Sequence, residues 1–181
     1  MRHDPSDANR PDYGASPLYT PEQRRCRDAT RWTLVQGILA PVQFLVFLIS
    51  LTLVLRYLAT GDGAGAATLS IVVKTATLYT IMITGSIWEK VVFDKWLFAE
   101  SFFWEDVFSM LVLALHSAYL VALVGGYGSE RGRMLLALAA YASYVINAAQ
   151  FLLKLRAARL QGSGAPSIAA ASMSVTAAVA G

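Results

Sequence analysis

The stretch WTLVQGILAPVQFLVFLISLTLVLRY, residues 32–57, decides the fold class of this chain. About 20 predominantly apolar residues suffice for a helix to cross the hydrocarbon of a bilayer. This run is longer than that, and its one charged residue, Arg56, stands near its end. It is also too long for the apolar segment of a cleaved signal peptide. We therefore predict a retained transmembrane helix.

Three further apolar stretches have the length of a membrane span, at about residues 66–90, 105–125 and 133–154. Of the 181 residues, 56% are apolar and 15% are charged, and the mean hydropathy is +0.49. Soluble domains are less apolar and more highly charged than this. The predicted fold is all-α, an integral membrane bundle of four transmembrane helices.

The positive charges orient this predicted bundle. The N-terminal tail, the central loop and the C-terminal segment together hold eleven Lys and Arg, against three on the opposite side. Because cytoplasmic loops carry the excess of positive charge, both termini are expected in the cytoplasm. The basic residues flank apolar runs instead of forming one patch, so the pI near 9.1 does not indicate nucleic-acid binding.

The chain divides into three segments. Residues 1–19 are predicted to be a disordered tail, residues 20–160 the four-helix transmembrane domain, and residues 161–181, rich in Ser, Gly and Ala, a low-complexity tail. Thr20 and Gln23 have the spacing of a capping box around a Pro at the first helical position. A helix is expected to begin there and to run into the first span.

Each span carries polar residues at helical spacing, which places them on one face of the helix. Gln43, His116 and Asn147 belong to such stripes. Polar groups cost free energy against lipid, so these faces are expected to turn inward and form a polar seam. Gln43 and Asn147 are equally explained as hydrogen bonds between helices, and His116 as either a ligand or a packing residue. Lys74 is interpreted as a side chain that extends outward to the membrane interface.

Charged and aromatic residues are concentrated in IWEKVVFDKWLFAESFFWEDVF, residues 87–108, where seven charged side chains stand among eight aromatic ones. Glu89 lies at the end of the second span, and Glu105 and Asp106 open the third. Acidic residues at a helix N-terminus and Trp at a membrane interface are each ordinary. Two acidic clusters facing each other across one short loop, however, can hold one carboxyl protonated and another ionised.

The sequence argues against several kinds of site. Cys26 is the single cysteine, which excludes an intramolecular disulfide, a CxxC redox pair and a thiolate zinc site. Only His116 is embedded, so a haem held by histidines of two facing spans is poorly supported. No HExxH, GxGxxG, GxxxxGK or GxSxG motif stands at a fitting element. No metal site is predicted.

Three long stretches of the chain resemble one known family. They are LYTPEQRRCRDATRWTLVQGILAPVQFLVFLISL, YTIMITGSIWEKVVFDKWLFAESFFWEDVFSMLVLALHSAYL and ALAAYASYVINAAQFLLKLRAARL. They closely resemble the bacteriochlorophyllide 3-vinyl hydratases of anoxygenic phototrophs, with a likeness that runs from about Leu18 to Leu160. The resemblance implies addition of water to the C3 vinyl group of chlorophyllide a or a related chlorin, giving a 1-hydroxyethyl group, in bacteriochlorophyll biosynthesis.

The same resemblance implies that no cofactor is needed, because the magnesium belongs to the pigment. It also implies a multi-pass protein of the bacterial inner membrane, in its intracytoplasmic photosynthetic part. The expected partners are a chlorophyllide-type tetrapyrrole and the lipid bilayer, and no nucleic acid. A homo-oligomer, or association with other enzymes of pigment biosynthesis, stays open.

For this reaction we expect a neutral carboxylic acid to protonate the terminal vinyl carbon and a second carboxylate to deprotonate the incoming water. The candidate catalytic residues are Glu105, Glu89 and Asp106, with Glu105 favoured because it begins the polar stripe of the third span. Which carboxyl is acid and which is base stays open. His116 is expected to bind the pigment magnesium or a ring carbonyl. Candidate substrate-binding residues are Trp88, Trp104, Phe108, Gln43 and Asn147.

The alternative is a non-enzymatic membrane pigment-binding or assembly factor. Such a protein would use the same aromatic rings, His116 and polar seam, but it has no need of opposed carboxylates. A small transporter is disfavoured, because its essential acid would lie in the middle of a span, whereas the acids here lie at the edge.

Overall fold

The computed structural model describes residues 18–163, so most of both predicted tails lies outside the described residues. A short helix, α1 (Pro21–Ala29), precedes four long ones, which are α2 (Arg31–Thr60), α3 (Ala64–Phe93), α4 (Phe103–Val124) and α5 (Glu130–Ser163). The described part of the chain has no strand. The prediction of an all-helical fold is confirmed.

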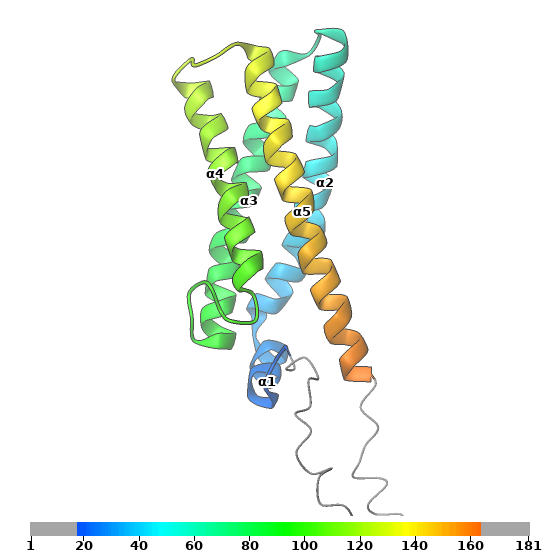
Figure 1. The fold of residues 1–181 in the computed structure, drawn as a ribbon, viewed down its shortest axis with the longest axis vertical. Coiled ribbons are helices and arrows are strands. Elements are labelled where there is room, and N and C mark those ends of the chain that lie inside the picture. The colour runs from blue at the N-terminus through cyan, green and yellow to red at the C-terminus, as the bar shows by residue number, and fades with distance from the viewer. Residues whose placement is uncertain (1–17, 164–181) are drawn as a thin grey trace, which may run out of the picture.

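Helices α2 to α5 are each long and apolar enough to cross a membrane, which confirms the predicted number of spans. They run side by side (Figure 1), and α1, the loop between α3 and α4, and the C-terminal end of α5 lie at one end of the bundle. We call this end the α1 end. Both ends of the described chain lie there, as four crossings require. Its placement in the cytoplasm stays a prediction.

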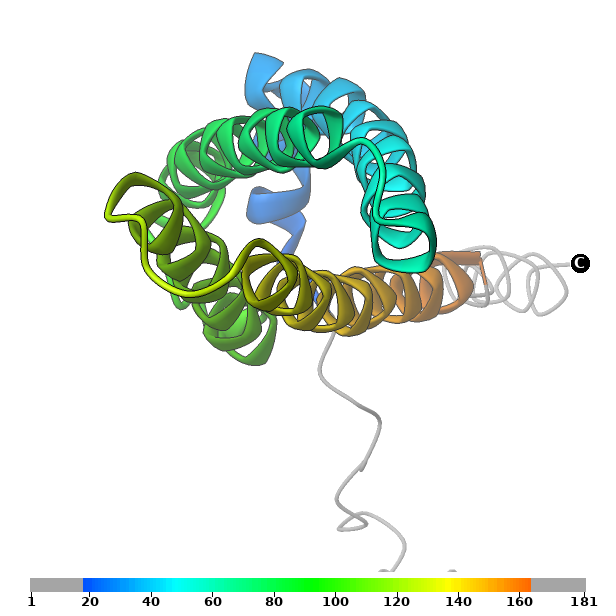
Figure 2. The ribbon, with the colours of Figure 1, turned by 90° about the horizontal axis from the view of Figure 1, so that it is seen from above.

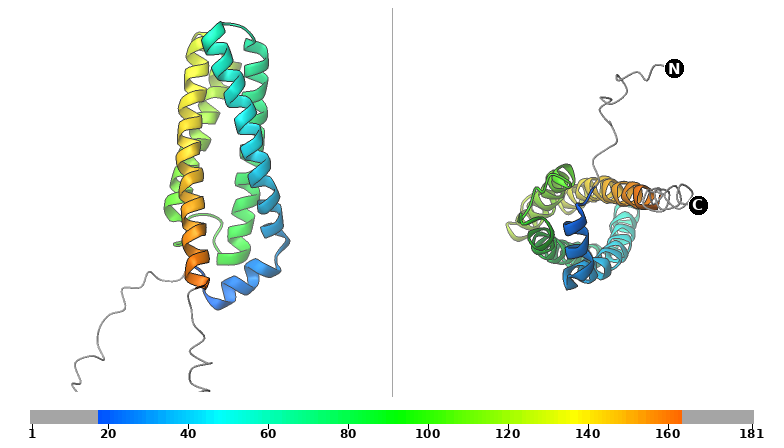
Figure 3. Two further views of the ribbon diagram at one scale, coloured as in Figure 1. Left: turned by 90° about the vertical axis from the view of Figure 1, so that its right-hand side faces the viewer. Right: turned by 90° about the horizontal axis from the view of Figure 1, so that it is seen from below.

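The bundle consists of two helical hairpins. Seen from above, α2, α3, α4 and α5 follow one another around a ring (Figure 2). The most extensive contacts are between α2 and α3 and between α4 and α5, whereas contacts between the two hairpins are fewer. The ribbons of α2 and α5 diverge toward the α1 end (Figure 3, left). At that end the hairpins are joined by a smaller cluster of side chains, which includes Trp88, Phe102 and Phe151.

An apolar core joins the hairpins where they are close. All four long helices contribute to it, with Phe47, Val54, Ile71, Leu78, Val112, Tyr119, Met134 and Tyr141 among its members. The outer surface is also apolar, since side chains such as Leu45, Ile83 and Leu153 are more than half exposed. A surface of this kind suits contact with hydrocarbon and not with water, because apolar side chains on it do not have to be hydrated. The backbone hydrogen bonds are made within each helix, as hydrocarbon requires.

The start of the helical region is confirmed in one respect and wrong in another. Thr20 and Gln23 form the predicted capping box, with the Thr20 Oγ1 accepting the Gln23 N–H at 3.2 Å and the Gln23 Oε1 accepting the Thr20 N–H at 2.9 Å. The helix does not run into the first span, because it ends at Ala29 and α2 starts anew at Arg31. Thr30 adopts an extended backbone between them and accepts the Trp32 N–H. The polar helix α1 therefore packs against α3 at the bundle end.

Replacement of Phe47 by Ala tests whether this core holds the hairpins together. The Phe47 ring is 3% exposed and lies 5.5 Å and 4.9 Å from the rings of Tyr141 and Tyr144 across the hairpin boundary. We expect a loss of about 3 kcal/mol of stability, seen as earlier thermal unfolding in mild detergent. Leu45→Ala, at a side chain 59% exposed to lipid, is the matched control and should change little. Equal losses in both variants would contradict this account of the core.

Candidate active site

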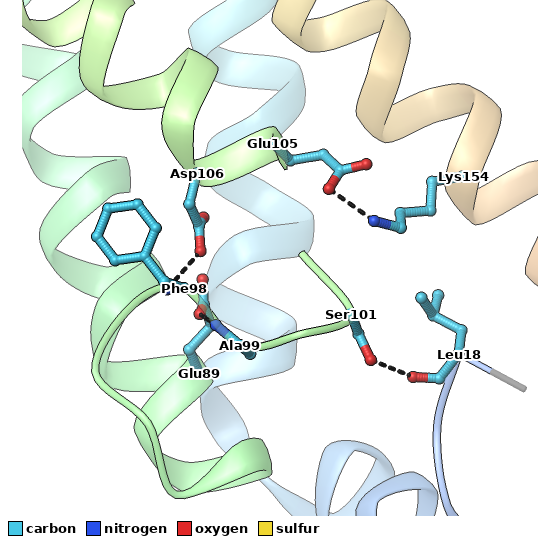
Figure 4. A network of polar contacts seen from close by, with 8 residues as sticks. All are labelled: Leu18, Glu89, Phe98, Ala99, Ser101, Glu105, Asp106 and Lys154. Carbon is cyan, nitrogen blue, oxygen red and sulfur yellow. Dashed lines mark hydrogen bonds and ion pairs between the residues drawn. The ribbon is translucent and has the colours of Figure 1, made fainter. Parts of the chain in front are cut away.

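The loop between α3 and α4 folds back over the α1 end of the bundle and presents two backbone donors to buried acids (Figure 4). The Phe98 N–H donates to Asp106 Oδ2 at 2.8 Å, and the Ala99 N–H donates to Glu89 Oε2 at 3.4 Å. Phe98 has a φ of 59°, an unfavourable conformation for a bulky residue. The hydrogen bond to Asp106 offsets part of this cost, because a hydrogen bond to a charged carboxylate is stronger than one between two neutral groups.

Glu89 and Asp106 form a buried pair of carboxyl groups. They come from α3 and α4, one from each hairpin, and are 6% and 3% exposed. Their carboxyl groups lie next to each other, and each accepts from an amide of the loop (Figure 4). Two neighbouring carboxyl groups repel each other when both are ionised, which favours a proton on one of them. The pair therefore brings two titratable groups, one from each hairpin, to one point.

Glu105 has a different partner. Its Oε2 accepts from Lys154 Nζ of α5 at 2.6 Å, and the carboxyl side chain is 9% exposed. The Lys154 Nζ also lies 5.1 Å from the centre of the Phe102 ring. Neighbouring residues of a helix point about 100° apart, so Glu105 and Asp106 reach different neighbours. The structure thus divides the three predicted acids into a carboxyl pair and an ion pair.

Aromatic rings pack beside the carboxyl pair. The ring centres of Trp88 and Phe102 are 5.9 Å apart, with the rings edge to face. The Phe102 ring also stacks on Phe151, again with 5.9 Å between the ring centres. The Trp88 Nε1 donates to Thr33 Oγ1 at 2.9 Å, which fixes the plane of the indole. Of the three rings predicted to bind substrate, only Trp88 belongs to this cluster. Trp104 is 67% exposed and packs on Phe103 alone among the described rings, and Phe108 is half-buried outside the cluster.

The residues that precede α1 also belong to the site, which the sequence did not indicate. Tyr19, placed in the predicted tail, is 5% exposed and stacks on Phe93 at 5.7 Å. Burial raises the pKa of the Tyr19 hydroxyl, although the Arg27 guanidinium 4.8 Å from its ring partly opposes this. The Leu18 carbonyl accepts from Ser101 Oγ at 3.0 Å. The N-terminal segment is thereby anchored to α3 and to the loop.

A hollow of about 560 Å³ lies between this segment, the loop and α5. Its walls include Thr20, Phe93, Ala99 and Lys154. The three acids do not line it, but two lining residues contact acids, because Ala99 donates to Glu89 and Lys154 donates to Glu105. Small-molecule sites typically have volumes of about 300–1,000 Å³. The hollow is large enough to admit part or all of a small organic ligand at the α1 end of the bundle.

The polar seam predicted inside the bundle is confirmed. Gln43, His116 and Asn147, from three different helices, are 3%, 1% and 9% exposed. Asn147 Nδ2 donates to Ser109 Oγ at 2.8 Å, and His116 Nδ1 pairs with the Val112 carbonyl at 2.8 Å. Several buried polar atoms nevertheless have no hydrogen-bond partner within the described part of the chain; they include both amide atoms of Gln43, Nε2 of His116, Oδ1 of Asn147 and Oε1 of Gln150. Buried polar groups nearly always form a hydrogen bond to protein, water or ligand. These atoms therefore indicate a place where water or a ligand binds.

The interpretation of Lys74 as an outward-reaching side chain is wrong. It is fully buried, and its Nζ lies 3.7 Å from the centre of the Tyr144 ring of α5. The helix α3 is 30 residues long and begins at Ala64, so Lys74 lies about 15 Å from its start. At that depth and on the face toward α5, the ammonium cannot extend to the interface.

Comparison with known proteins covers the whole of this site. Residues 19–157 match the family described as 2-vinyl bacteriochlorophyllide hydratase. The chain is 70% identical over 145 residues to the 2-vinyl bacteriochlorophyllide hydratase of Cereibacter sphaeroides, an alignment that covers 79% of this chain and 89% of that relative. It is 66% identical over 144 residues to the protein of the same name from Rhodobacter capsulatus, with 80% and 84% covered. No solved structure matches the chain.

The family match extends from Tyr19, which packs against the loop, past Lys154, which pairs with Glu105. It therefore includes the carboxyl pair, the aromatic cluster, the polar seam and all of the hollow's lining residues except Leu18. From the extent of this match and the identity to both relatives, the chain belongs to the 2-vinyl bacteriochlorophyllide hydratase family.

Proposed function

We propose that the protein adds water to the C3 vinyl group of chlorophyllide a, or of a closely related chlorin, to give the 1-hydroxyethyl product in bacteriochlorophyll biosynthesis. The vinyl position called 2 in the older tetrapyrrole numbering is C3 in the current one. Membership of the hydratase family supports the reaction type. The observation that carries the chemistry is the buried carboxyl pair, which offers a proton donor and a proton acceptor at one point.

Hydration of a vinyl group on a conjugated macrocycle starts with transfer of a proton to the terminal carbon. The cation that forms at the inner carbon is delocalised into the ring system. Water then forms the new C–O bond, and one of its protons leaves to a base. No electron is gained or lost by the protein in these steps. The proposal therefore includes no cofactor, with the magnesium carried by the pigment.

Within the carboxyl pair, the protonated member donates to carbon and the ionised member accepts the proton lost by water. The pair then holds one proton again, so the cycle closes without exchange with solvent. The Phe98 and Ala99 amides stabilise the negative charge that is present while the proton is on the substrate. Glu89 and Asp106 can exchange the roles of acid and base between turnovers.

This arrangement gives Glu105 a supporting role. The Glu105 Oε2 already accepts from the Lys154 ammonium at 2.6 Å, so this carboxyl group is engaged with a cation of α5, whereas, among the described residues, Glu89 and Asp106 accept only from backbone amides. We propose that Glu105 and Lys154 orient the water or the pigment edge next to the pair. The sequence-based preference for Glu105 as the acid is accordingly replaced by a preference for Glu89 and Asp106.

The aromatic cluster and the seam supply binding. Trp88, which is half-buried, offers a ring to a flat macrocycle, and Gln43 and Asn147 offer polar groups to its periphery. His116, with its Nε2 free of partners in the described chain, is proposed to meet the pigment magnesium or a ring carbonyl. It lies ten residues from Asp106, about 15 Å along α4, so a bound macrocycle has to span most of that distance.

A pigment carrier or assembly factor is the second candidate, because the rings, His116 and the seam would serve it equally. The proposed setting for either function is the inner membrane of a phototrophic bacterium. Membranes that contain the protein should convert added chlorophyllide a into a product heavier by one water, with a shift in its absorption. Binding of the pigment without this gain in mass would support the carrier and refute the hydratase.

Glu89→Gln and Asp106→Asn test the carboxyl pair. Each should lower kcat by about 10²-fold to 10⁴-fold, the usual contribution of general acid–base catalysis, and leave pigment binding largely unchanged. The matched control is Glu100→Gln in the same loop, whose side chain is 95% exposed. Normal turnover by both pair variants would remove the pair from the mechanism.

Glu105→Gln separates the two assignments of the acid. If Glu105 positions water or pigment through Lys154, kcat should fall by about tenfold, less than in Glu89→Gln, and single-turnover measurements should still show product. A loss equal to or larger than that of Glu89→Gln would return the role of acid to Glu105.

A further inference from the structure

The proposed mechanism leaves Lys74 unexplained. Its side chain is fully buried, and its Nζ has no hydrogen-bond partner in residues 18–163. No acidic side chain in that range lies within ion-pair distance of it. The face of Tyr144 at 3.7 Å satisfies one direction of an ammonium that has three donors. Charged residues within a membrane bundle are rare and commonly mark the path or site of a ligand.

The surroundings of Lys74 are built by all four long helices. Phe47 of α2 lies against Tyr141 and Tyr144 of α5, and the His116 ring of α4 lies 5.8 Å from Tyr141. This layer is aromatic, and its described members carry no negative charge. It therefore suits an apolar, flat ligand that brings its own anion to the ammonium.

Unpartnered polar atoms lie between this layer and the carboxyl pair. Along α5, Tyr144 is followed by Asn147, Gln150 and Lys154 at helical spacing, and the distance from first to last is about 15 Å. Asn147 and Gln150 each have a side-chain oxygen without a partner in the described chain. On α2, Gln43 lies one turn nearer the α1 end than Phe47 and lacks partners there as well. Along α3, Lys74 and Glu89 are 15 residues apart, about 22 Å of helix rise, which their side chains shorten by reaching toward each other. The ammonium and the carboxyl pair thus stand at two ends of one polar seam.

We propose, on the basis of the proposed function, that Lys74 binds the free carboxylate of the pigment side chain and so selects the free acid over its ester. A chlorophyllide differs from a chlorophyll in that its propionic acid side chain is unesterified and therefore anionic. The vinyl group and this side chain stand on different parts of the macrocycle edge. A pigment lying along the seam presents the vinyl group to Glu89 and Asp106 and its carboxylate to Lys74.

The lysines that line the hollow are the rival partners for a carboxylate. Lys95 lies 3.7 Å from Glu100 with its side chain 52% exposed, and Lys154 is paired with Glu105. Both already have an anion, and an exposed ammonium gains little from another because water screens the charge. Lys74 is buried and has no anion among the described residues, so the same contact is stronger there.

The test compares chlorophyllide a with its propionate methyl ester as substrates of the full-length protein in membranes. The wild type should prefer the free acid by at least about tenfold in kcat/KM, as expected for loss of one hydrogen bond to a charged group. Lys74→Met should lower turnover of the free acid to the level of the ester and leave the ester unchanged. Lys74→Arg should retain most of the preference, and Lys95→Met, the matched control in the hollow, should retain all of it.

Turnover of the ester by Lys74→Met shows at the same time that the variant is folded. If that variant does not accumulate, Lys74→Gln is used for the same comparison. A wild type that treats acid and ester alike, or a neutral Lys74 variant that keeps the preference, overturns the proposal. Loss of the preference in Lys95→Met would place the carboxylate in the hollow and overturn it too.

Titration of the two pigments by quenching of tryptophan fluorescence separates this proposal from the proposed function. Preferential binding of the free acid that disappears in Lys74→Met supports the role of Lys74 even if no hydration occurs. Absence of hydration in the wild type refutes the hydratase function alone. Equal binding of acid and ester by the wild type refutes the role of Lys74 alone.

Discussion

Two hydrogen bonds from the α3–α4 loop hold together the part of the bundle where the chemistry is proposed. Phe98 and Ala99 donate their backbone N–H groups to Asp106 and Glu89, which belong to different hairpins. The hairpins pack closely at the other end of the bundle. Over the whole bundle, contacts between the hairpins are fewer than contacts within each hairpin. The loop therefore holds both buried acids beneath it at the end where a smaller apolar cluster, with Val92, Phe102 and Phe151 among its members, takes the place of the main core. Without these two donors, the two buried acids would lack hydrogen-bond partners that offset the free-energy cost of their burial.

Polar groups within a membrane need partners, and this requirement explains why the interior of the bundle has an apolar part and a polar part. Near the far end, large apolar side chains fill the space between the hairpins and determine their relative position. Toward the α1 end the interior holds amides, His116 and the acids, several of which have atoms without a partner in the described chain. An interior of this kind is stable only with water or a ligand in place. The two parts meet at the layer of Phe47, Tyr141 and Tyr144, which belongs to the core and also bounds the polar seam at Lys74.

Much of the fold follows from local patterns in the sequence. Four apolar runs of sufficient length predict four spanning helices, because backbone groups in hydrocarbon must be satisfied within a helix. The capping box at Thr20 depends on residues three apart and is equally local. The break at Thr30 was missed, since a Thr is compatible with both helix and cap, and only the packing of α1 against α3 favours the cap. The burial of Tyr19 was missed for a related reason, because the rings that it packs against belong to residues more than 70 positions away in the sequence.

By itself the sequence determined the fold class, the number of spans, and which helix faces are polar, because hydropathy and a period of 3.6 residues are properties of short segments. It also determined that acids flank one loop. Only the tertiary structure decided which acids meet. Glu89 and Asp106 come together beneath the loop amides, Glu105 pairs with Lys154, and Lys74 turns inward to Tyr144. Periodicity defines the face on which a side chain lies but not the neighbour opposite it, since that depends on how the hairpins are rotated and where the loop between them returns.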